Sequence, residues 1–303
     1  MNWLKIITAI ILLGLLWGCD REEEALPVIG YSEQPPELGV QSYRFAIHPL
    51  YSPGRLFEKF APVVDYLNQQ FHGFKLVLEA SRDYPAYDEK IRAQQPDFLL
   101  PNPFQTLIAL RYGYHVIGKV ADDSDFRGLI LVRKDSPIQK VTDLKGGVIV
   151  APGPTALAAT MMPKYYLATH GLDVQRDVRY HYAGTQESTM MTLYLKQADA
   201  ATTWPVPWRL LQQQRPHVAA QLKVMWQTET LPSNSVMAHE RVPASVAKQV
   251  MAALVAMGED PVGRRLLQNS TFTEFVYADD QTYAPVEAFI QQYSQRVEPV
   301  EIK

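Results

Sequence analysis

The stretch from Val141 to Gly171 reads VTDLKGGVIVAPGPTALAATMMPKYYLATHG. Its order predicts a short loop, a buried strand at Val148–Val150, a tight turn rich in Pro and Gly, and a helix that Thr155 opens and that ends near Gly171. This order directs the N-terminus of a helix toward whatever lies beyond the carboxyl end of the strand. Free backbone N–H groups and the helix dipole make such a place suitable for an anion, and ligands commonly bind at this edge of open α/β sheets.

The composition is that of a globular protein with room for two domains. The chain has 303 residues, of which 47% are hydrophobic and 20% are charged, and its formal net charge is −3. This length allows two domains of ordinary size, each with its own core. No basic run and no stripe of alternating basic and aromatic residues is present, so the sequence argues against a nucleic-acid partner.

The N-terminus has the pattern of a secretory signal. Lys5 precedes the apolar run Ile6–Trp17, which is too short for a comfortable membrane span. The residues Leu16-Trp17-Gly18-Cys19 at the end of this run resemble the lipobox of bacterial lipoproteins. Cys19 is the only cysteine in the chain. We therefore predict a signal peptide over residues 1–18, a lipidated Cys19 and periplasmic localisation.

The segment after the cysteine is expected to tether the protein. Asp20 resembles the signal that retains such lipoproteins at the inner membrane of enteric-type bacteria. Residues 19–41 are acidic and rich in proline, which favours a flexible linker between the lipid anchor and the folded part.

The segment after the tether predicts a doubly wound lobe. Strands are expected at Tyr43–Ile47, Phe74–Leu78 and Phe98–Leu100, and helices after Ser52-Pro53, after Asp83 and from Phe104 to Arg111. This β-α-β-α-β order is typical of an α/β fold. Tyr114–Val120 and Gly128–Arg133 are expected to be further strands, and Leu131–Ser136 to be the first crossing into a second lobe.

The second half of the chain repeats the same β-α order. After Val148–Val150 and its helix, we expect a strand at Val178–Tyr182, a helix from Gln186 to Leu195 and a strand at Ala198–Thr202. Leu222–Trp226 and Ser235–Ala238 are expected to return to the first lobe. The predicted organisation is lobe 1 at 42–132 plus 232–303, lobe 2 at 133–231, and a two-strand hinge beside a cleft.

Several motifs together resemble the periplasmic substrate-binding proteins of phosphate, phosphite and phosphonate ABC transporters, often called PhnD-like. The resemblance covers roughly residues 43–290, and it rests on the order of Asp83-Tyr84, Pro96-Asp97-Phe98, Asn102-Pro103-Phe104, Thr142-Asp143-Leu144-Lys145-Gly146, Gly184-Thr185-Gln186 and Ala198-Asp199-Ala200-Ala201. It implies a two-lobed periplasmic binding protein of type II. It also implies that Tyr84, Asn102, Thr155 and Gln186 line the ligand site.

The chain departs from the family pattern at the ligand motif. Pro154 and Ala156 flank Thr155 where serines are expected, and Gln186 stands in place of a histidine. The backbone N–H groups after Pro154, including that of Ala156, and the hydroxyl of Thr155 remain as donors for an oxyanion. Phosphonate specificity does not follow from these residues, and a less charged or larger organic ligand is an alternative.

Some candidate residues have an equally simple structural role. Asp199 either accepts a hydrogen bond from the ligand or braces the cleft by accepting backbone N–H groups. Trp204 either walls the cleft or covers an edge of the core. Asn102 either contacts the ligand or only shapes its Pro-Asn-Pro turn.

The sequence predicts a binding protein rather than an enzyme. It contains no Gly-x-Ser-x-Gly, His-Glu-x-x-His or Walker-type motif, its histidines lack metal-ligand spacing, and no cofactor or metal is expected. The first hypothesis is a lipid-anchored binding protein that traps a small, oxyanionic ligand by hinge closure and presents it to an ABC permease. The alternatives are a ligand sensor for a membrane histidine kinase and, less favoured, a periplasmic hydrolase or transferase.

Overall fold

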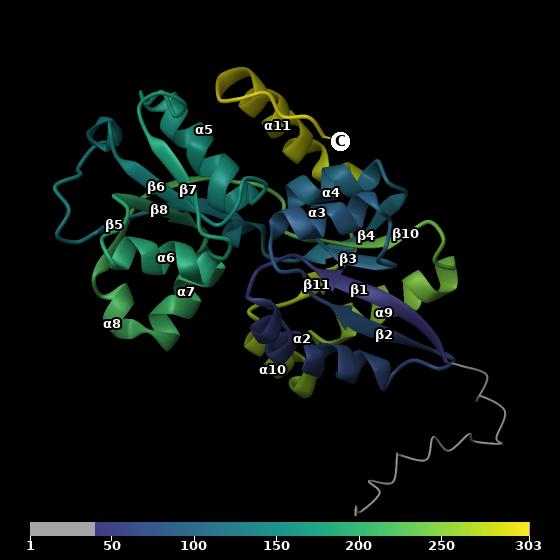
Figure 1. The fold of residues 1–303 in the computed structure, drawn as a ribbon. Helices are drawn as coiled ribbons and strands as arrows, with labels where there is room; N and C mark the ends of the chain where they lie inside the picture. Colours follow the sequence, from purple (N-terminus) through teal and green to yellow (C-terminus); the bar gives the residue numbers. More distant parts are fainter. Residues whose placement is uncertain (1–39, 303) are drawn as a thin grey trace, which may run out of the picture. The chain divides into compact units, whose positions relative to one another are not determined.

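The fold is mixed α/β, as the sequence predicts. The computed structural model describes residues 40–302, which belong to one compact unit. The predicted signal peptide, Cys19 and nearly all of the predicted tether lie outside the described residues. Among residues 40–302, the strands form two sheets that are covered by helices (Figure 1). No helix in this part of the chain combines the length and the apolar character that a membrane span requires.

The first lobe is built on a six-stranded sheet. In the described chain its order is β11-β4-β10-β3-β1-β2. The strands are β1 Gln41–Ile47, β2 Phe74–Glu79, β3 Phe98–Leu100, β4 Tyr114–Val120, β10 Ser235–His239 and β11 Phe275–Val276. Strand β1 pairs in parallel with β2 and β3, whereas β10 runs antiparallel to β3 and β4.

The second lobe is built on a five-stranded sheet. The order within the described residues is β7-β6-β8-β5-β9. The strands are β5 Arg127–Arg133, β6 Val148–Ala151, β7 Arg179–Tyr182, β8 Ala200–Thr203 and β9 Leu222–Thr230. Strand β6 pairs in parallel with β7 and β8, whereas β5 runs antiparallel to β8 and β9. Each sheet thus contains three parallel strands and a strand that runs antiparallel to them. This antiparallel strand is β10, beside β3, in the first sheet and β5, beside β8, in the second.

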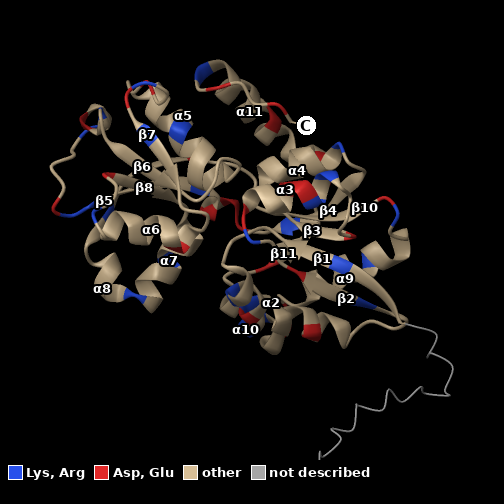
Figure 2. Cartoon of the chain, in the orientation of Figure 1, with Lys and Arg blue, Asp and Glu red and all other residues tan. Residues whose placement is uncertain are grey.

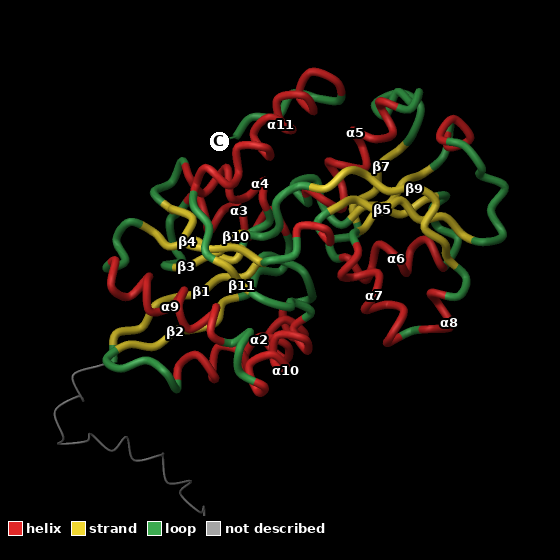
Figure 3. The backbone as a smooth tube through the Cα atoms, turned by 180° about the vertical axis from the view of Figure 1, so that it is seen from behind, coloured by secondary structure: helices red, strands yellow, loops and turns green. Residues whose placement is uncertain are grey.

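Helices cover both faces of each sheet, and Figure 3 shows the strands at the centre of each lobe from behind. In the first lobe they are α2 Pro53–Asn68, α3 Tyr84–Arg92, α4 Pro103–Leu110, α9 Ala244–Ala256, α10 Pro261–Ser270 and α11 Ala284–Arg296. In the second lobe they are α5 Met162–Thr169, α6 Gln186–Tyr194, α7 Pro205–Gln214 and α8 Pro216–Ala219. Short helical turns lie at Asp123–Asp125, Val141–Leu144, Leu157–Met161 and Asp280–Tyr283.

The central strands of the second sheet, β5, β6 and β8, are buried on both faces. Along β5, Leu129 and Leu131 pack with one cluster that includes residues of α6, whereas Ile130 and Val132 pack with a cluster on the α5 side. Successive side chains of a strand point to opposite faces, so a strand between two helical layers must be apolar at every position. This explains the continuous hydrophobic run of the opening stretch at Val148–Val150.

The chain passes between the lobes earlier than the sequence suggests. Strand β4 ends at Val120 in the first sheet, and β5 begins at Arg127 in the second, so the first crossing occupies residues 121–126. The expected crossing at Leu131–Ser136, and with it the boundary between 132 and 133, is wrong. Strand β9 also stays in the second sheet, where it pairs with β5. Only β10 returns as expected, after residues 231–234.

The C-terminal helix contacts both lobes. Helix α11 packs on α4 and on α5 (Figure 1). The ring centroids of Phe289 and Tyr165 lie 5.4 Å apart, and the Glu298 carboxylate lies 2.8 Å from the Lys164 ammonium group. Since Lys164 is almost fully buried, this ion pair anchors the C-terminal segment to the second lobe.

The helix of the opening stretch starts later than expected and in a different form. It begins with a π-helical turn at Leu157–Met161 and continues as α5 from Met162. Pro163 lacks an N–H group and cannot bond to the carbonyl of Ala159, which favours a wider turn at this place. Thr155 is therefore not the N-cap, a position that Ala156 occupies without a side-chain cap.

Gly128 allows this π-helical turn to lie against β5. A Cβ atom at position 128 would lie 2.7 Å from the carbonyl oxygen of Ala158 and 2.7 Å from the ring of Pro163. The substitution Gly128→Ala should therefore displace the turn and lower the free energy of unfolding by about 1–3 kcal/mol. Urea denaturation would measure this effect, and Gly54→Ala, where a Cβ atom would meet nothing within 4 Å, is the control. Equal stability of the two variants would contradict the packing argument.

Candidate functional site

A small cavity lies between the two lobes. Its volume is about 10 Å³, room for about one water molecule, and it is lined by His48, Tyr84, Asn102, Phe126, Ala156, Leu157, Ala158, Ala159, Gln186, Trp204 and Asn234. These residues follow the carboxyl ends of parallel strands in both sheets, or precede the antiparallel strands β5 and β10. The cavity therefore occupies the ligand-binding edge that is expected for α/β sheets.

The first lobe contributes polar side chains that follow its three parallel strands. His48 comes directly after β1, Tyr84 begins α3 after β2, and Asn102 follows β3. Asn102 caps α4, because its Oδ1 accepts the N–H groups of Phe104 and Gln105 at 2.9 and 3.1 Å. Its Nδ2 donates to the Thr155 carbonyl of the second lobe at 3.0 Å. Asn102 thus lines the cavity, but its amide is already used within the protein.

The second lobe contributes backbone donors. Leu157, Ala158 and Ala159 form the first positions of the helix and line the cavity. Their N–H groups have no acceptor among the described residues, as is usual for a helix start. The N–H of Ala156, in contrast, donates to Gly153 at 3.3 Å. The predicted oxyanion donors therefore lie one to three residues further along the chain than Ala156.

Gln186 and Trp204 complete the wall on the second lobe. Gln186 is buried at the start of α6, where its Oε1 accepts from the Thr203 hydroxyl at 2.9 Å. Its Nε2 donates to the Tyr84 hydroxyl of the other lobe at 3.5 Å. Trp204 precedes α7 and packs against Phe126 with ring centroids 5.8 Å apart. The indole N–H of Trp204 has no hydrogen bond within residues 40–302, so it is available as a donor.

Two of the expected site residues do not line this cavity. Asp199 precedes β8 and therefore lies at the opposite edge of the parallel sheet, where its carboxylate accepts the Val148 N–H at 2.8 Å. It accepts a backbone N–H group, as one of its two anticipated roles requires, but at the edge away from the cleft. Thr155 lies beside the cavity, but its hydroxyl donates to Asp88 of the first lobe at 3.1 Å.

Among residues 40–302, no Lys, Arg, Asp or Glu side chain lines the cavity. Charged residues of both signs are instead distributed around the outside of the two lobes (Figure 2). Burial raises the pKa of Tyr84, so its hydroxyl keeps its proton. No group of three His, Cys, Asp or Glu side chains in the described part of the chain could hold a metal ion. The cavity therefore offers mainly uncharged hydrogen-bond donors.

Sequence reasoning missed His48, Phe126, Asn234 and the backbone of Leu157–Ala159. The position of His48 directly after a predicted strand was a usable signal. The sequence around Phe126 and Asn234 gave no such signal. These residues precede β5 and β10, and they lie at this edge only because those two strands run antiparallel to their neighbours.

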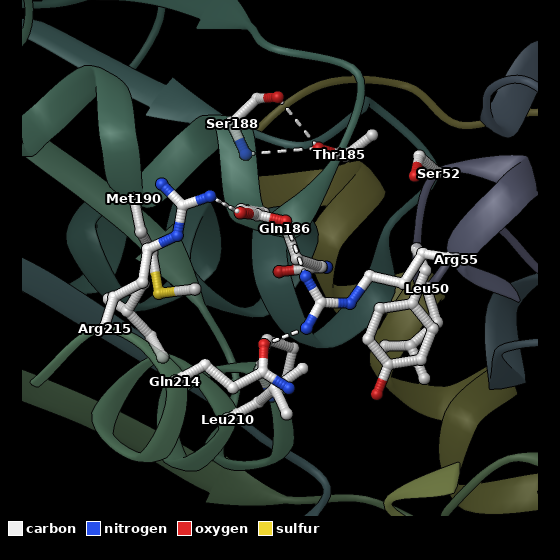
Figure 4. A pocket seen from close by; sticks show the side chains of 14 residues that line it. Leu50, Ser52, Arg55, Thr185, Gln186, Ser188, Met190, Leu210, Gln214 and Arg215 are labelled. Carbon is white, nitrogen blue, oxygen red and sulfur yellow. Dashed lines mark hydrogen bonds and ion pairs between the residues drawn. The ribbon is translucent and has the colours of Figure 1, made fainter. Parts of the chain in front are cut away.

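A larger pocket lies beside the cavity and is also formed by both lobes. Its volume is about 160 Å³, and Gln186 lines both spaces. Figure 4 shows Arg55 of the first lobe reaching toward residues of α6 and α7. Arg55 lies 3.4 Å from Glu187 and donates to Gln214, and Glu187 also pairs with Arg215 at 2.7 Å. This network joins the lobes next to the cavity.

Comparison with known proteins agrees with this geometry. A curated relative, the phosphonates-binding periplasmic protein of Escherichia coli, is 20% identical over 162 residues, which cover 52% of this chain and about half (48%) of that protein.

Solved structures of two further proteins share the fold. A binding protein component of an ABC phosphonate transporter from Pseudomonas aeruginosa is 18% identical, with a TM-score of 0.76 over 84% of this chain and 87% of that one. The protein PhnD1 from Prochlorococcus marinus, solved in complex with methylphosphonate, is 15% identical, with a TM-score of 0.76 over 85% of this chain and 100% of that one. These likenesses confirm the predicted type II periplasmic binding protein fold.

A family model settles the class of protein. The model described as "ABC transporter, phosphonate, periplasmic substrate-binding protein" matches residues 45–283. Because this family consists of transporter-associated binding proteins, the prediction of a binding protein rather than an enzyme is confirmed. The chain belongs to the family of periplasmic substrate-binding proteins of phosphonate ABC transporters.

Proposed function

We propose that this protein captures a small tetrahedral oxyanion of the phosphonate, phosphite or phosphate class and delivers it to an ABC permease. The observation that carries the proposal is the set of free donors in the cavity, above all the N–H groups of Leu157–Ala159. A helix start supplies such donors together with the positive end of the helix dipole. No carboxylate lines the cavity to oppose an anion.

The strength of these donors is sufficient for capture. A hydrogen bond to a charged group contributes about 1.5–3 kcal/mol, and micromolar affinity corresponds to about 8 kcal/mol. Three backbone donors together with Trp204 therefore supply free energy of the required size.

Binding by closure of the two lobes is supported by the contacts that cross between them. Tyr84, Asp88 and Asn102 of the first lobe bond to Gln186 and Thr155 of the second lobe around the cavity. Such bonds form only when the lobes are together, so they and the enclosed ligand favour the closed form over an open one.

A lipid anchor at Cys19 completes the proposal. The cysteine follows an apolar run of signal-peptide type. A tethered binding protein stays near the membrane that contains its permease. Asp20 would retain it at the inner membrane.

Ligand capture is tested by calorimetry with phosphite, phosphate and methylphosphonate. We expect at least one of them to bind, and Trp204→Phe to weaken binding about tenfold, since it removes an N–H donor but keeps an aromatic ring. Trp208→Phe is the matched control, because Trp208 lies on α7 but does not line the cavity. If none of the three anions binds the wild-type protein, the proposed ligand class is wrong.

The cross-lobe bond of Asp88 predicts a pH dependence of stability. Burial raises the pKa of this carboxyl from 3.8 to about 6, against the bonds from Gln105 and Thr155. A pKa raised by folding means that the stabilising contribution is complete below about pH 4 and is lost as the pH rises through about 6. The side chain of Asp88→Asn does not titrate, so the variant does not lose this contribution to the free energy of unfolding as the pH rises. The free energy of unfolding of the variant relative to wild type should therefore rise by about 1–3 kcal/mol between pH 4 and pH 7.

Urea denaturation at several pH values measures this difference, and His48, whose titration is common to both proteins, cancels. Asp65→Asn, at an exposed position of α2, is the control. A difference for Asp88→Asn that does not change with pH would show that Asp88 is not a buried carboxylate of this kind.

The lipid anchor is tested by Cys19→Ser. Removing the only thiol of the chain should transfer the processed protein from the membrane fraction to the soluble periplasmic fraction. Ligand binding should be unchanged. Equal sedimentation of wild type and variant with membranes would contradict lipidation at this residue.

A further inference from the structure

The imidazole of His48 lines the cavity in one specific tautomer. It is almost fully buried, and its Nδ1 lies 3.1 Å from the carbonyl oxygen of Leu100. A carbonyl oxygen can only accept a hydrogen bond, so Nδ1 must carry the proton. Burial lowers the pKa of the ring to about 4, which leaves the imidazole neutral under periplasmic conditions. The other ring nitrogen, Nε2, is therefore an unprotonated acceptor.

This acceptor has no partner in the protein. No donor among residues 40–302 forms a hydrogen bond with Nε2, whereas Nδ1 is engaged with Leu100. His48 lines a cavity whose other free groups are mainly donors. An unprotonated nitrogen among donors is unfavourable for a fully deprotonated anion, because two lone pairs would face each other.

The neighbouring Asn234 has an unsatisfied amide. It is completely buried and lines the same cavity, its Nδ2 lies 3.3 Å from Nδ1 of His48, and its Oδ1 has no hydrogen-bond partner. With the proton on Nδ1, this orientation brings two donors together. Hydrogen bonding decides between the two orientations of an amide. Rotation by 180° places Oδ1 against the Nδ1–H group, where it helps to hold the ring in this tautomer, and moves Nδ2 to the fully buried position that Oδ1 occupied.

We propose that His48 and Asn234 together select a tetrahedral oxyanion that still carries one proton. His48 Nε2 accepts the P–OH proton of a hydrogen phosphonate, phosphite or phosphate ion, and Asn234 Oδ1 supports the required tautomer by accepting from the Nδ1–H group of His48. This inference rests on the proposed function and narrows its ligand class. Sulfonates and sulfate have no such proton at neutral pH, so they meet the lone pair of Nε2 and are disfavoured.

The test compares methylphosphonate with methanesulfonate, which have the same shape but differ in this proton. Calorimetry at neutral pH should give the wild-type protein at least tenfold higher affinity for methylphosphonate. His48→Phe should weaken methylphosphonate binding about 10- to 100-fold without weakening methanesulfonate binding, so that the ratio falls toward one. His239→Phe is the matched control, since His239 is buried beside Tyr114 and does not line the cavity.

Asn234→Ala separates the two roles. The Leu100 carbonyl still accepts from Nδ1–H in this variant, which keeps Nε2 unprotonated, so the ratio of the two affinities should persist. If His48→Phe does not fold, nitrogen NMR of labelled wild-type protein replaces it. Methylphosphonate should then shift the unprotonated nitrogen of His48 toward a hydrogen-bonded value, and methanesulfonate should not.

The outcomes distinguish this inference from the proposed function. Absence of binding by every phosphorus oxyanion and by methanesulfonate would overturn the proposed function itself. Equal affinity of the wild-type protein for methylphosphonate and methanesulfonate, or an unchanged ratio in folded His48→Phe, would overturn only the selection by His48.

Discussion

The structure depends on the shared direction of parallel strands. The carboxyl ends of β1, β2 and β3 lie at one edge of the first sheet, and those of β6, β7 and β8 lie at one edge of the second. The two crossings at 121–126 and 231–234 bring these edges together. Groups that follow six different strands therefore converge on one cavity. Asp199, which precedes a parallel strand, is excluded by the same rule.

In the proposed function, the cavity holds an anion with uncharged groups only. Its polar groups are backbone N–H groups, an indole, a phenol, amides and a neutral imidazole. Fixed dipoles of this kind stabilise an anion without the cost of burying a lysine or arginine in an unliganded protein. They also make the position of each proton important. A single acceptor such as His48 Nε2 then distinguishes anions that have the same shape and charge.

The contacts between the lobes include groups that are costly to bury. Asp88 is a buried carboxylate whose hydrogen bonds come from neutral donors, Gln105 and Thr155. Its raised pKa reports this cost. In the proposed binding cycle, such a group makes the closed form only moderately favoured, which suits reopening and release of the ligand.

Much of the fold followed from local sequence. Strands such as Phe98–Leu100 and Tyr114–Val120 were predicted at their observed bounds, because apolar runs between turn residues leave few alternatives. The family motifs also pointed to Tyr84, Asn102 and Gln186, and the local sequence pointed to Trp204; all four line the cavity. Strand pairing could not be inferred in the same way. The sequence of β9 does not show that it stays with β5, since pairing partners are distant in the chain.

The opening stretch shows where local sequence stops being sufficient. By itself, the sequence determined a buried strand, a tight turn and a following helix at Val141–Gly171, because these depend on hydrophobic periodicity and on Pro and Gly. Tertiary structure decided that Thr155 bonds to Asp88, that the free donors are those of Leu157–Ala159, and that His48 and Asn234 meet them. Those contacts join residues far apart in the chain, and only the packing of two sheets across a shared edge brings them within hydrogen-bonding distance.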